Sequence, residues 1–178
     1  MSTITTNVRG TEILLELCNK LFIASTSEIY GKGGERLDED HDRVMGSVRN
    51  WRWAYACTKE MDEFLAIAYH AEHKLPVIIG RLFNIVGPRQ TGQYGMVLPT
   101  FVGQALRGEP ITVYGDGQQR RCFCHVLDTV DAIARLMMER RQPVIAKIDR
   151  AVGWRPTRAL DEIIDETIAY HRGTGASA

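Results

Sequence analysis

The segment Leu21-Phe22-Ile23-Ala24-Ser25-Thr26-Ser27-Glu28 joins a short apolar run to a cluster of polar side chains. The apolar residues 21–24 predict a buried β-strand, and the polar residues mark the point where it ends. A second apolar run, Leu75 to Phe83, predicts another buried strand. Between the two runs, Trp51 to His73 carries apolar residues at helical spacing. Strand, helix and strand in this order predict parallel pairing in an α/β layer.

The remaining secondary structure is predicted from apolar periodicity and from glycine positions. Further helices are expected over Asn7 to Lys20, Val97 to Leu106, Leu127 to Arg140 and Leu160 to His171. Gly108 follows the second of these helices and can cap it. Ile111 to Tyr114 predicts a strand, and Arg121 to Val126 is expected to be extended.

The composition is that of an ordinary globular protein. The chain has 178 residues, of which 44% are hydrophobic, and 22 basic residues balance 22 acidic ones. This balance gives no electrostatic case for nucleic acid or an anionic membrane as a partner. The apolar runs are too short to span a bilayer, and the first seven residues lack the features of a secretory signal. The cysteines are scattered, which favours free thiols in a reducing cytoplasm: Cys18, Cys57, Cys122 and Cys124.

Tyr55-Ala-Cys-Thr-Lys59 lies inside the predicted long helix and places a phenol and an ammonium on one helical face. A tyrosine has a pKa of about 10 in water, so it is a poor base near neutral pH. A lysine ammonium about 4 Å away can stabilise the phenolate by something on the order of 4 kcal/mol. Thr26 lies at the end of the preceding strand, a usual place for catalytic groups in open α/β sheets. Thr26, Tyr55 and Lys59 together predict a proton-transfer site.

Taken alone, Tyr-x-x-x-Lys is frequent by chance, and a pair on a helix surface is then the better explanation. Its neighbours make the signal specific. In combination, the motifs closely resemble those of the extended short-chain dehydrogenase/reductase family, in its NAD-dependent epimerase/dehydratase branch, which acts on nucleotide-sugars. The resemblance covers nearly the whole chain and rests on Ser25–Gly31, Tyr55–Lys59, Arg81–Arg89, Gly108–Gly117, Arg121–Phe123 and Val152–Thr157.

The resemblance implies a role for individual residues. Tyr55 would take the proton from a sugar hydroxyl as hydride leaves for NAD, and Lys59 would lower the pKa of the tyrosine and hold the nicotinamide ribose. Thr26 would match the Ser/Thr hydroxyl of the family, and Asn7 an asparagine close to the cofactor and the lysine. The substrate would be bound by Asn84, Arg89, Val113, Tyr114 and Arg121. No metal site is predicted.

Ser27 and Glu28 discriminate between reactions within this branch. Dehydratases carry Asp-Glu after the threonine, whereas Thr-Ser-Glu resembles UDP-glucuronate decarboxylases, in which Glu28 would match a catalytic residue and an oxidised 4-keto intermediate loses carbon dioxide. Simple 4-epimerases need neither acid, and Glu28 would then be a hydrogen-bonding loop residue. Decarboxylation and epimerisation of a UDP-sugar therefore remain equally favoured at this point.

The resemblance also implies a partial Rossmann-like α/β fold. The family's N-terminal dinucleotide-binding strands and Gly-rich turn have no counterpart here, and a strand and helix of the substrate domain are expected to be missing between Arg141 and Val144. We therefore expect weakened affinity for NAD(H) or NADP(H). One compact unit is expected over residues 1–178, with a Rossmann-like remnant over 1–89, a substrate-binding region over 90–142 and a C-terminal segment over 143–178.

Two other functions remain open. The site could serve a stand-alone NAD(P)H-dependent reductase of small hydroxy-carbonyl compounds, or the chain could be a non-catalytic remnant that binds a nucleotide-sugar or a protein partner. The family commonly dimerises through the helices that correspond to Asn7–Lys20 and Trp51–His73. An unpaired apolar strand edge also tends to seek a partner chain, so we expect a homodimer or a higher homo-oligomer.

Overall fold

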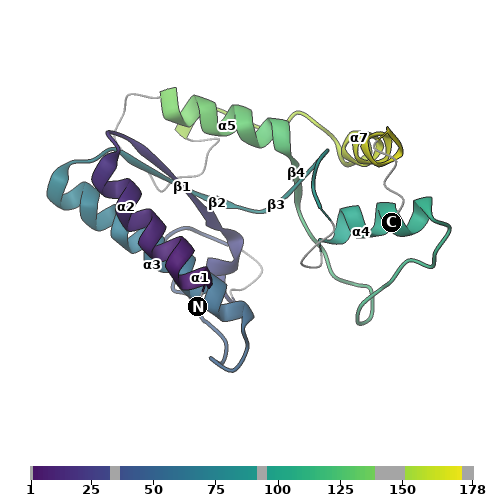
Figure 1. The fold of residues 1–178 in the computed structure, drawn as a ribbon, viewed down its shortest axis with the longest axis horizontal. Coiled ribbons are helices and arrows are strands. Elements are labelled where there is room, and N and C mark those ends of the chain that lie inside the picture. Colours follow the sequence, from purple (N-terminus) through teal and green to yellow (C-terminus); the bar gives the residue numbers. More distant parts are fainter. Residues whose placement is uncertain (1, 33–36, 92–95, 139–150, 174–178) are drawn as a thin grey trace. The chain divides into compact units, whose positions relative to one another are not determined.

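The computed structural model describes residues 2–32, 37–91, 96–138 and 151–173 (Figure 1). The chain forms two compact units, Met1–Leu82 with Ile133–Trp154, and Phe83–Ala132 with Arg155–Ala178. This division differs from the single unit with boundaries after residues 89 and 142 that the sequence suggested. The chain leaves the first unit after Leu82 and returns to it at Ile133. The junction expected between Arg141 and Val144 lies outside the described residues.

The first unit is built on a pair of parallel strands. Strand β1 (Leu21–Thr26) pairs with strand β2 (Val77–Leu82), with Leu21 opposite Val77 and Thr26 opposite Leu82. The predicted parallel pairing is confirmed, and β1 extends two polar residues further than the apolar run, through Ser25 and Thr26. The core beside the sheet consists of buried apolar side chains from the strands and two helices: Leu15, Ile23, Ala66, Val77 and Ile79.

The N-terminal helical segment begins earlier than predicted and contains a change of helix type. It comprises helix α1 (Ser2–Ile4), the π-helical turn η1 (Thr5–Arg9) and helix α2 (Gly10–Leu17). The backbone of Cys18 is extended, so the helix ends before the predicted Lys20. A π-turn widens the helix by one residue, and such turns occur frequently at functional sites.

Helix α3 (Arg52–His73) follows the prediction to within one residue, and it packs against β1 beside α2 (Figure 1). Both helices also keep large apolar side chains at the surface. Six large apolar side chains remain exposed: Ile13, Leu14 and Leu17 on α2, and Met61, Phe64 and Ile67 on α3. These six residues are called the helix-pair patch below. None of the described helices is long and apolar enough to cross a membrane.

The second unit is built on a second pair of parallel strands. Strand β3 (Asn84–Val86) pairs with β4 (Phe123–His125), and helix α4 (Val97–Leu106) contacts helix α7 (Leu160–Gly173). The core of this unit joins one buried residue from each of three elements: Val86 of β3, Leu98 of α4 and Ile163 of α7. Helix α5 (Val126–Met138) follows β4 directly.

The predicted strand over residues 111–114 does not form. Ile111, Val113 and Tyr114 are exposed, and no strand of the described chain pairs with them. The side chain of Gln104 instead holds this segment, because its Oε1 accepts from the backbone N–H of Thr112 at 3.1 Å and its Nε2 donates to the Thr112 hydroxyl at 2.7 Å. A run of β-forming residues makes a strand only when a neighbour supplies backbone partners, so local propensity failed here.

The cysteines behave as the sequence predicted. Cys18, Cys57, Cys122 and Cys124 are all free thiols. Cys57 and Cys122 are exposed, and the other two are partly buried.

Candidate functional site

The polar cluster after the first apolar run lies at the end of β1, as predicted. Thr26 is the last residue of the strand and caps the 3-10 helical turn η2 (Ser27–Tyr30), because its Oγ1 accepts from the backbone N–H of Glu28 at 3.2 Å. Glu28 itself is held by a two-point contact with Arg52, with Nε–Oε2 at 2.5 Å and Nη2–Oε1 at 3.0 Å. Arg52 thereby fixes the Glu28 carboxylate near the first turn of α3.

Tyr55 and Lys59 lie one turn apart on α3. The side chain of Tyr55 is accessible, since the residue is 43% exposed. The side chain of Lys59 is 15% exposed, and its Nζ donates to Oδ2 of the fully buried Asp62 at 3.0 Å. The phenol is thus open to a ligand, whereas the ammonium already has a carboxylate partner.

Asn7 lies in the π-turn and reaches α3 from there. Its Nδ2 donates to the hydroxyl of Thr58 at 2.9 Å, and this hydroxyl donates to the backbone carbonyl of Tyr55 at 2.9 Å. The predicted cofactor residues Asn7, Tyr55 and Lys59 are therefore brought to the same stretch of α3, with Asn7 linked to it through Thr58.

A buried ionic cluster, which the sequence reasoning missed, ties α3 to the ends of both strands. Glu63 is 3% exposed and accepts from Ser25 Oγ at 2.5 Å. It also accepts from Arg81 on β2, with Nε–Oε1 at 3.0 Å and Nη2–Oε2 at 2.8 Å. Ser25 precedes Thr26, and Glu63 follows Lys59 by one helical turn. Contacts of Glu63 with Ser25 and Arg81 therefore set how helix α3 meets the strand ends.

The partners of Arg81 favour its charged form. Burial alone would lower the pKa of Arg81, but its hydrogen bonds with Glu63 and its contact with Tyr30 outweigh burial and raise that pKa. Burial raises the pKa of Tyr30, whose ring lies 5.0 Å from the Arg81 guanidinium carbon. The sequence held a partial clue to this cluster. Glu63 lies four residues after Lys59, and Arg81 begins the motif Arg81–Arg89. Pairing between them, however, depends on tertiary structure.

The residues predicted to bind substrate all belong to the second unit. Asn84 begins β3, and its Nδ2 donates to the carbonyl of Cys122 on the neighbouring segment at 2.9 Å. Arg121 Nη1 donates to the adjacent Arg120 carbonyl at 2.8 Å. Arg89 lies in a turn with φ of 70°. Val113 and Tyr114 are 62% and 79% exposed, in the segment that was expected to be a strand.

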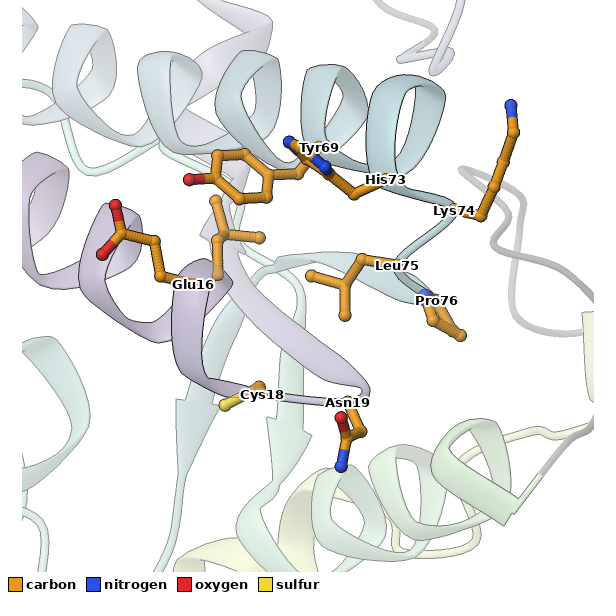
Figure 2. Close-up of a pocket in the computed structure, with 9 residues that line it drawn as sticks. Glu16, Cys18, Asn19, Tyr69, His73, Lys74, Leu75 and Pro76 are labelled. Carbon is orange, nitrogen blue, oxygen red and sulfur yellow. The ribbon is translucent and has the colours of Figure 1, made fainter.

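The first unit also has a cavity of about 540 Å³ at the other end of the strands (Figure 2). It is bordered by residues that precede β1 and β2, including Cys18, Asn19, Leu75 and Pro76. The end of α3 contributes Tyr69 and His73, and Lys74, which follows the helix, also borders the cavity with its side chain pointing away from the other lining residues (Figure 2). None of the predicted site residues lines this cavity, so it is separate from the Thr26 end of the sheet.

Comparison with known proteins places the chain in a family. Residues 1–148 match the NAD-dependent epimerase/dehydratase family. The chain is 45% identical over 142 residues to UDP-N-acetyl-alpha-D-glucosaminuronate decarboxylase of Bacillus cytotoxicus, covering 77% of this chain and 44% of that protein. It is 38% identical over 143 residues to UDP-glucuronic acid decarboxylase 5 of Arabidopsis thaliana, covering 77% of this chain and 41% of that protein.

The fold agrees with the same assignment. The crystal structure of UDP-glucuronic acid 4-epimerase from Bacillus cereus, in complex with UDP-glucuronic acid and NAD, is similar with a TM-score of 0.82 at 22% identity, over 96% of this chain and 68% of that one. The chain belongs to the NAD-dependent epimerase/dehydratase family and has part of its Rossmann-like α/β fold. It spans less than half the length of the two decarboxylases.

The described residues fit one side of NAD. A lysine ammonium and an accessible phenol on one helix face suit the ribose and the reacting end of the nicotinamide. A glycine-rich turn that opens a helix and would hold the pyrophosphate does not occur in the described part of the chain, because β1 leads into η2 and β2 leads into β3. The described residues therefore fit the nicotinamide and its ribose, and no described turn fits the pyrophosphate.

Proposed function

We propose that this chain carries the acid–base half of an NAD-dependent enzyme that decarboxylates a UDP-linked uronic acid through a 4-keto intermediate. The observation that supports this choice is the Thr26-Ser27-Glu28 cluster at the end of β1, in a chain 45% identical to a UDP-sugar acid decarboxylase over 142 residues. An epimerase has no need of a carboxylate at this place, whereas Glu28 here is fixed by two contacts with Arg52.

Each residue then has a role that its chemistry supports. Tyr55 takes the proton of the sugar 4-hydroxyl, and Thr26 holds the same oxygen by a hydrogen bond. The chemistry that bound NAD supplies is the removal of a hydride from the sugar carbon and the later return of that hydride. The Lys59 ammonium stabilises the phenolate form of Tyr55 and donates to the ribose hydroxyls. The keto group next to the carbon that bears the carboxylate accepts the electron pair released when the bond to carbon dioxide breaks.

Glu28 and Ser27 are proposed to act around this decarboxylation step. The Glu28 carboxylate, paired with Arg52, is a proton carrier at the strand end, and the Ser27 hydroxyl is a nearby hydrogen-bond donor. Asn84, Arg89 and Arg121 of the second unit are proposed for the phosphates and the carboxylate of the substrate, for which arginine is suited by its planar fork. Val113 and Tyr114 are proposed for the nucleoside.

The test is to incubate the protein with NAD and UDP-glucuronate, measure carbon dioxide release, and compare Tyr55→Phe with the wild type. Loss of the phenol is expected to lower the rate by about 10²- to 10⁴-fold, the usual contribution of a positioned acid–base group. Tyr69→Phe is the matched control, because Tyr69 lies on the same helix but borders the cavity at the other end of the strands.

Each outcome selects one function. Formation of an epimeric UDP-sugar without carbon dioxide would replace decarboxylation by epimerisation. Reduction of small hydroxy-carbonyl compounds with NADH or NADPH, without binding of UDP-glucuronate, would favour the stand-alone reductase. A calorimetric titration in which NAD, NADH, NADPH and UDP-glucuronate all fail to bind would leave only the non-catalytic function.

A further inference from the structure

Asp62 is a buried carboxylate that the proposed reaction does not use. Its side chain is fully buried within α3, where its Oδ2 accepts from Lys59 Nζ at 3.0 Å. Its second oxygen, Oδ1, is buried and has no hydrogen-bond partner among the residues that the structure describes. A carboxylate in this state is costly unless a cation remains beside it.

Asp62 continues the row of catalytic side chains. Tyr55, Lys59 and Asp62 are separated by four and then three residues, which places all three on one face of the helix. Exposure falls along this row, from 43% for Tyr55 to 15% for the Lys59 side chain and 0% for the Asp62 side chain. The Tyr55 phenol is accessible and the Asp62 carboxylate is buried. The Lys59 ammonium, which contacts Asp62, has an intermediate exposure.

The lysine can keep this partner and still serve the reaction. An ammonium has three N–H donors, so one can remain on Asp62 while two are left for other acceptors. If Lys59 turned away, the buried carboxylate would lose its cation, so the pair resists separation. Asp62 therefore restricts where the Lys59 ammonium can lie.

We propose that Asp62 is a positioning residue that holds the Lys59 ammonium where it can meet Tyr55 and the ribose hydroxyls of NAD. This inference rests on the proposed function, since it assumes that Lys59 binds the cofactor. It gives α3 a third member of the site, which acts through the lysine and does not itself touch the cofactor.

A double-mutant cycle in NADH binding tests the proposal, with wild type, Asp62→Asn, Lys59→Met and the double variant. Asp62→Asn keeps the shape of the side chain but removes its charge. NADH affinity is expected to fall about tenfold in the wild-type background, as for the loss of a hydrogen bond to a charged group. In the Lys59→Met background, the same substitution is expected to have no effect.

The control is Glu60→Gln, which removes a carboxylate next to Lys59 that pairs with Arg43 at 2.8 Å. It is expected to leave NADH affinity near the wild-type value. If Asp62→Asn fails to fold, Asp62→Ser carries the same cycle with a smaller neutral side chain.

The outcomes separate this inference from the proposed function. Equal losses of affinity with and without the lysine would show that Asp62 acts only through packing and would overturn the positioning role. An unchanged affinity in Asp62→Asn would overturn it as well. A wild-type protein that binds no NADH would overturn the proposed NAD-dependent function, and the positioning role with it.

Discussion

At the scale of single residues, neighbouring side chains on α3 have different tasks. Tyr55 is open to a ligand, whereas Glu63, two turns further along, is buried and binds Ser25 and Arg81. The same helix therefore presents an accessible phenol on one side and is held to the strand ends by a buried ion pair.

Glu63→Gln is expected to lower the free energy of unfolding by about 3 kcal/mol, because it leaves the buried Arg81 guanidinium without its countercharge. Chemical denaturation at neutral pH measures the loss. The exposed pair Arg107–Glu109 supplies the control, since Glu109→Gln is expected to leave the unfolding curve close to that of the wild type. Equal stability of Glu63→Gln and wild type would show that the buried pair does not stabilise the fold.

At the scale of secondary structure, a single carboxylate connects helix α5 to the segment before α7. Asp128, on α5, accepts from the backbone N–H groups of Thr157 and Arg158 at 2.9 Å and 3.0 Å, and from the Thr157 hydroxyl at 3.0 Å. The Arg158 guanidinium also contacts it. Burial alone would raise the pKa of Asp128, but these donors outweigh burial and lower it.

Asp128→Asn is expected to cost about 2 kcal/mol of unfolding free energy at pH 7, as charge-assisted hydrogen bonds are lost. Because the pKa of Asp128 is lowered in the folded state, its stabilisation is complete above the ordinary aspartate pKa and is lost as the pH falls through the lowered folded value. The difference from wild type should thus be constant between about pH 5 and 8 and shrink below about pH 4.

Denaturant unfolding at several pH values checks this dependence. Asp165→Asn, on the exposed side of α7, is the control and is expected to follow the wild type throughout. A stability difference for Asp128→Asn that persists unchanged down to pH 2 would contradict the assignment.

At the scale of the whole molecule, the helix-pair patch is a candidate surface for association between chains. Helices α2 and α3 lie side by side and expose six large apolar side chains, with Leu17 at 76% and Phe64 at 54% exposure. Exposed apolar side chains on two neighbouring helices favour association. We propose that two copies of the chain cover it by pairing α2 and α3 with their counterparts.

Light scattering at micromolar concentration is expected to give the mass of a dimer or larger assembly for the wild type and of a monomer for Phe64→Glu, because a charge cannot be buried unpaired in such an interface. Val48→Glu is the control, since Val48 is 97% exposed and lies outside the patch. A monomeric wild type would refute the proposal.

The local elements of the fold could be predicted because their causes are local. Apolar runs and helical spacing indicated β1, β2 and α3. The polar end of the first run indicated where Thr26 would lie, and the helical pattern indicated where Tyr55 would lie. The strand expected at 111–114 failed because a strand depends on a neighbour, and Gln104 held this segment instead. The helix ending at Leu17 and the π-turn at Asn7 were not evident in the pattern.

The sequence by itself determined the order of the elements, the family and the chemical identity of the Thr26, Tyr55 and Lys59 groups, because these depend on residue types and their spacing along the chain. Only the tertiary structure decided which charged groups meet. Glu63 meets Arg81 and Glu28 meets Arg52 because the fold brings separate elements together, and the burial of Glu63 and Arg81 gives that pair its electrostatic weight.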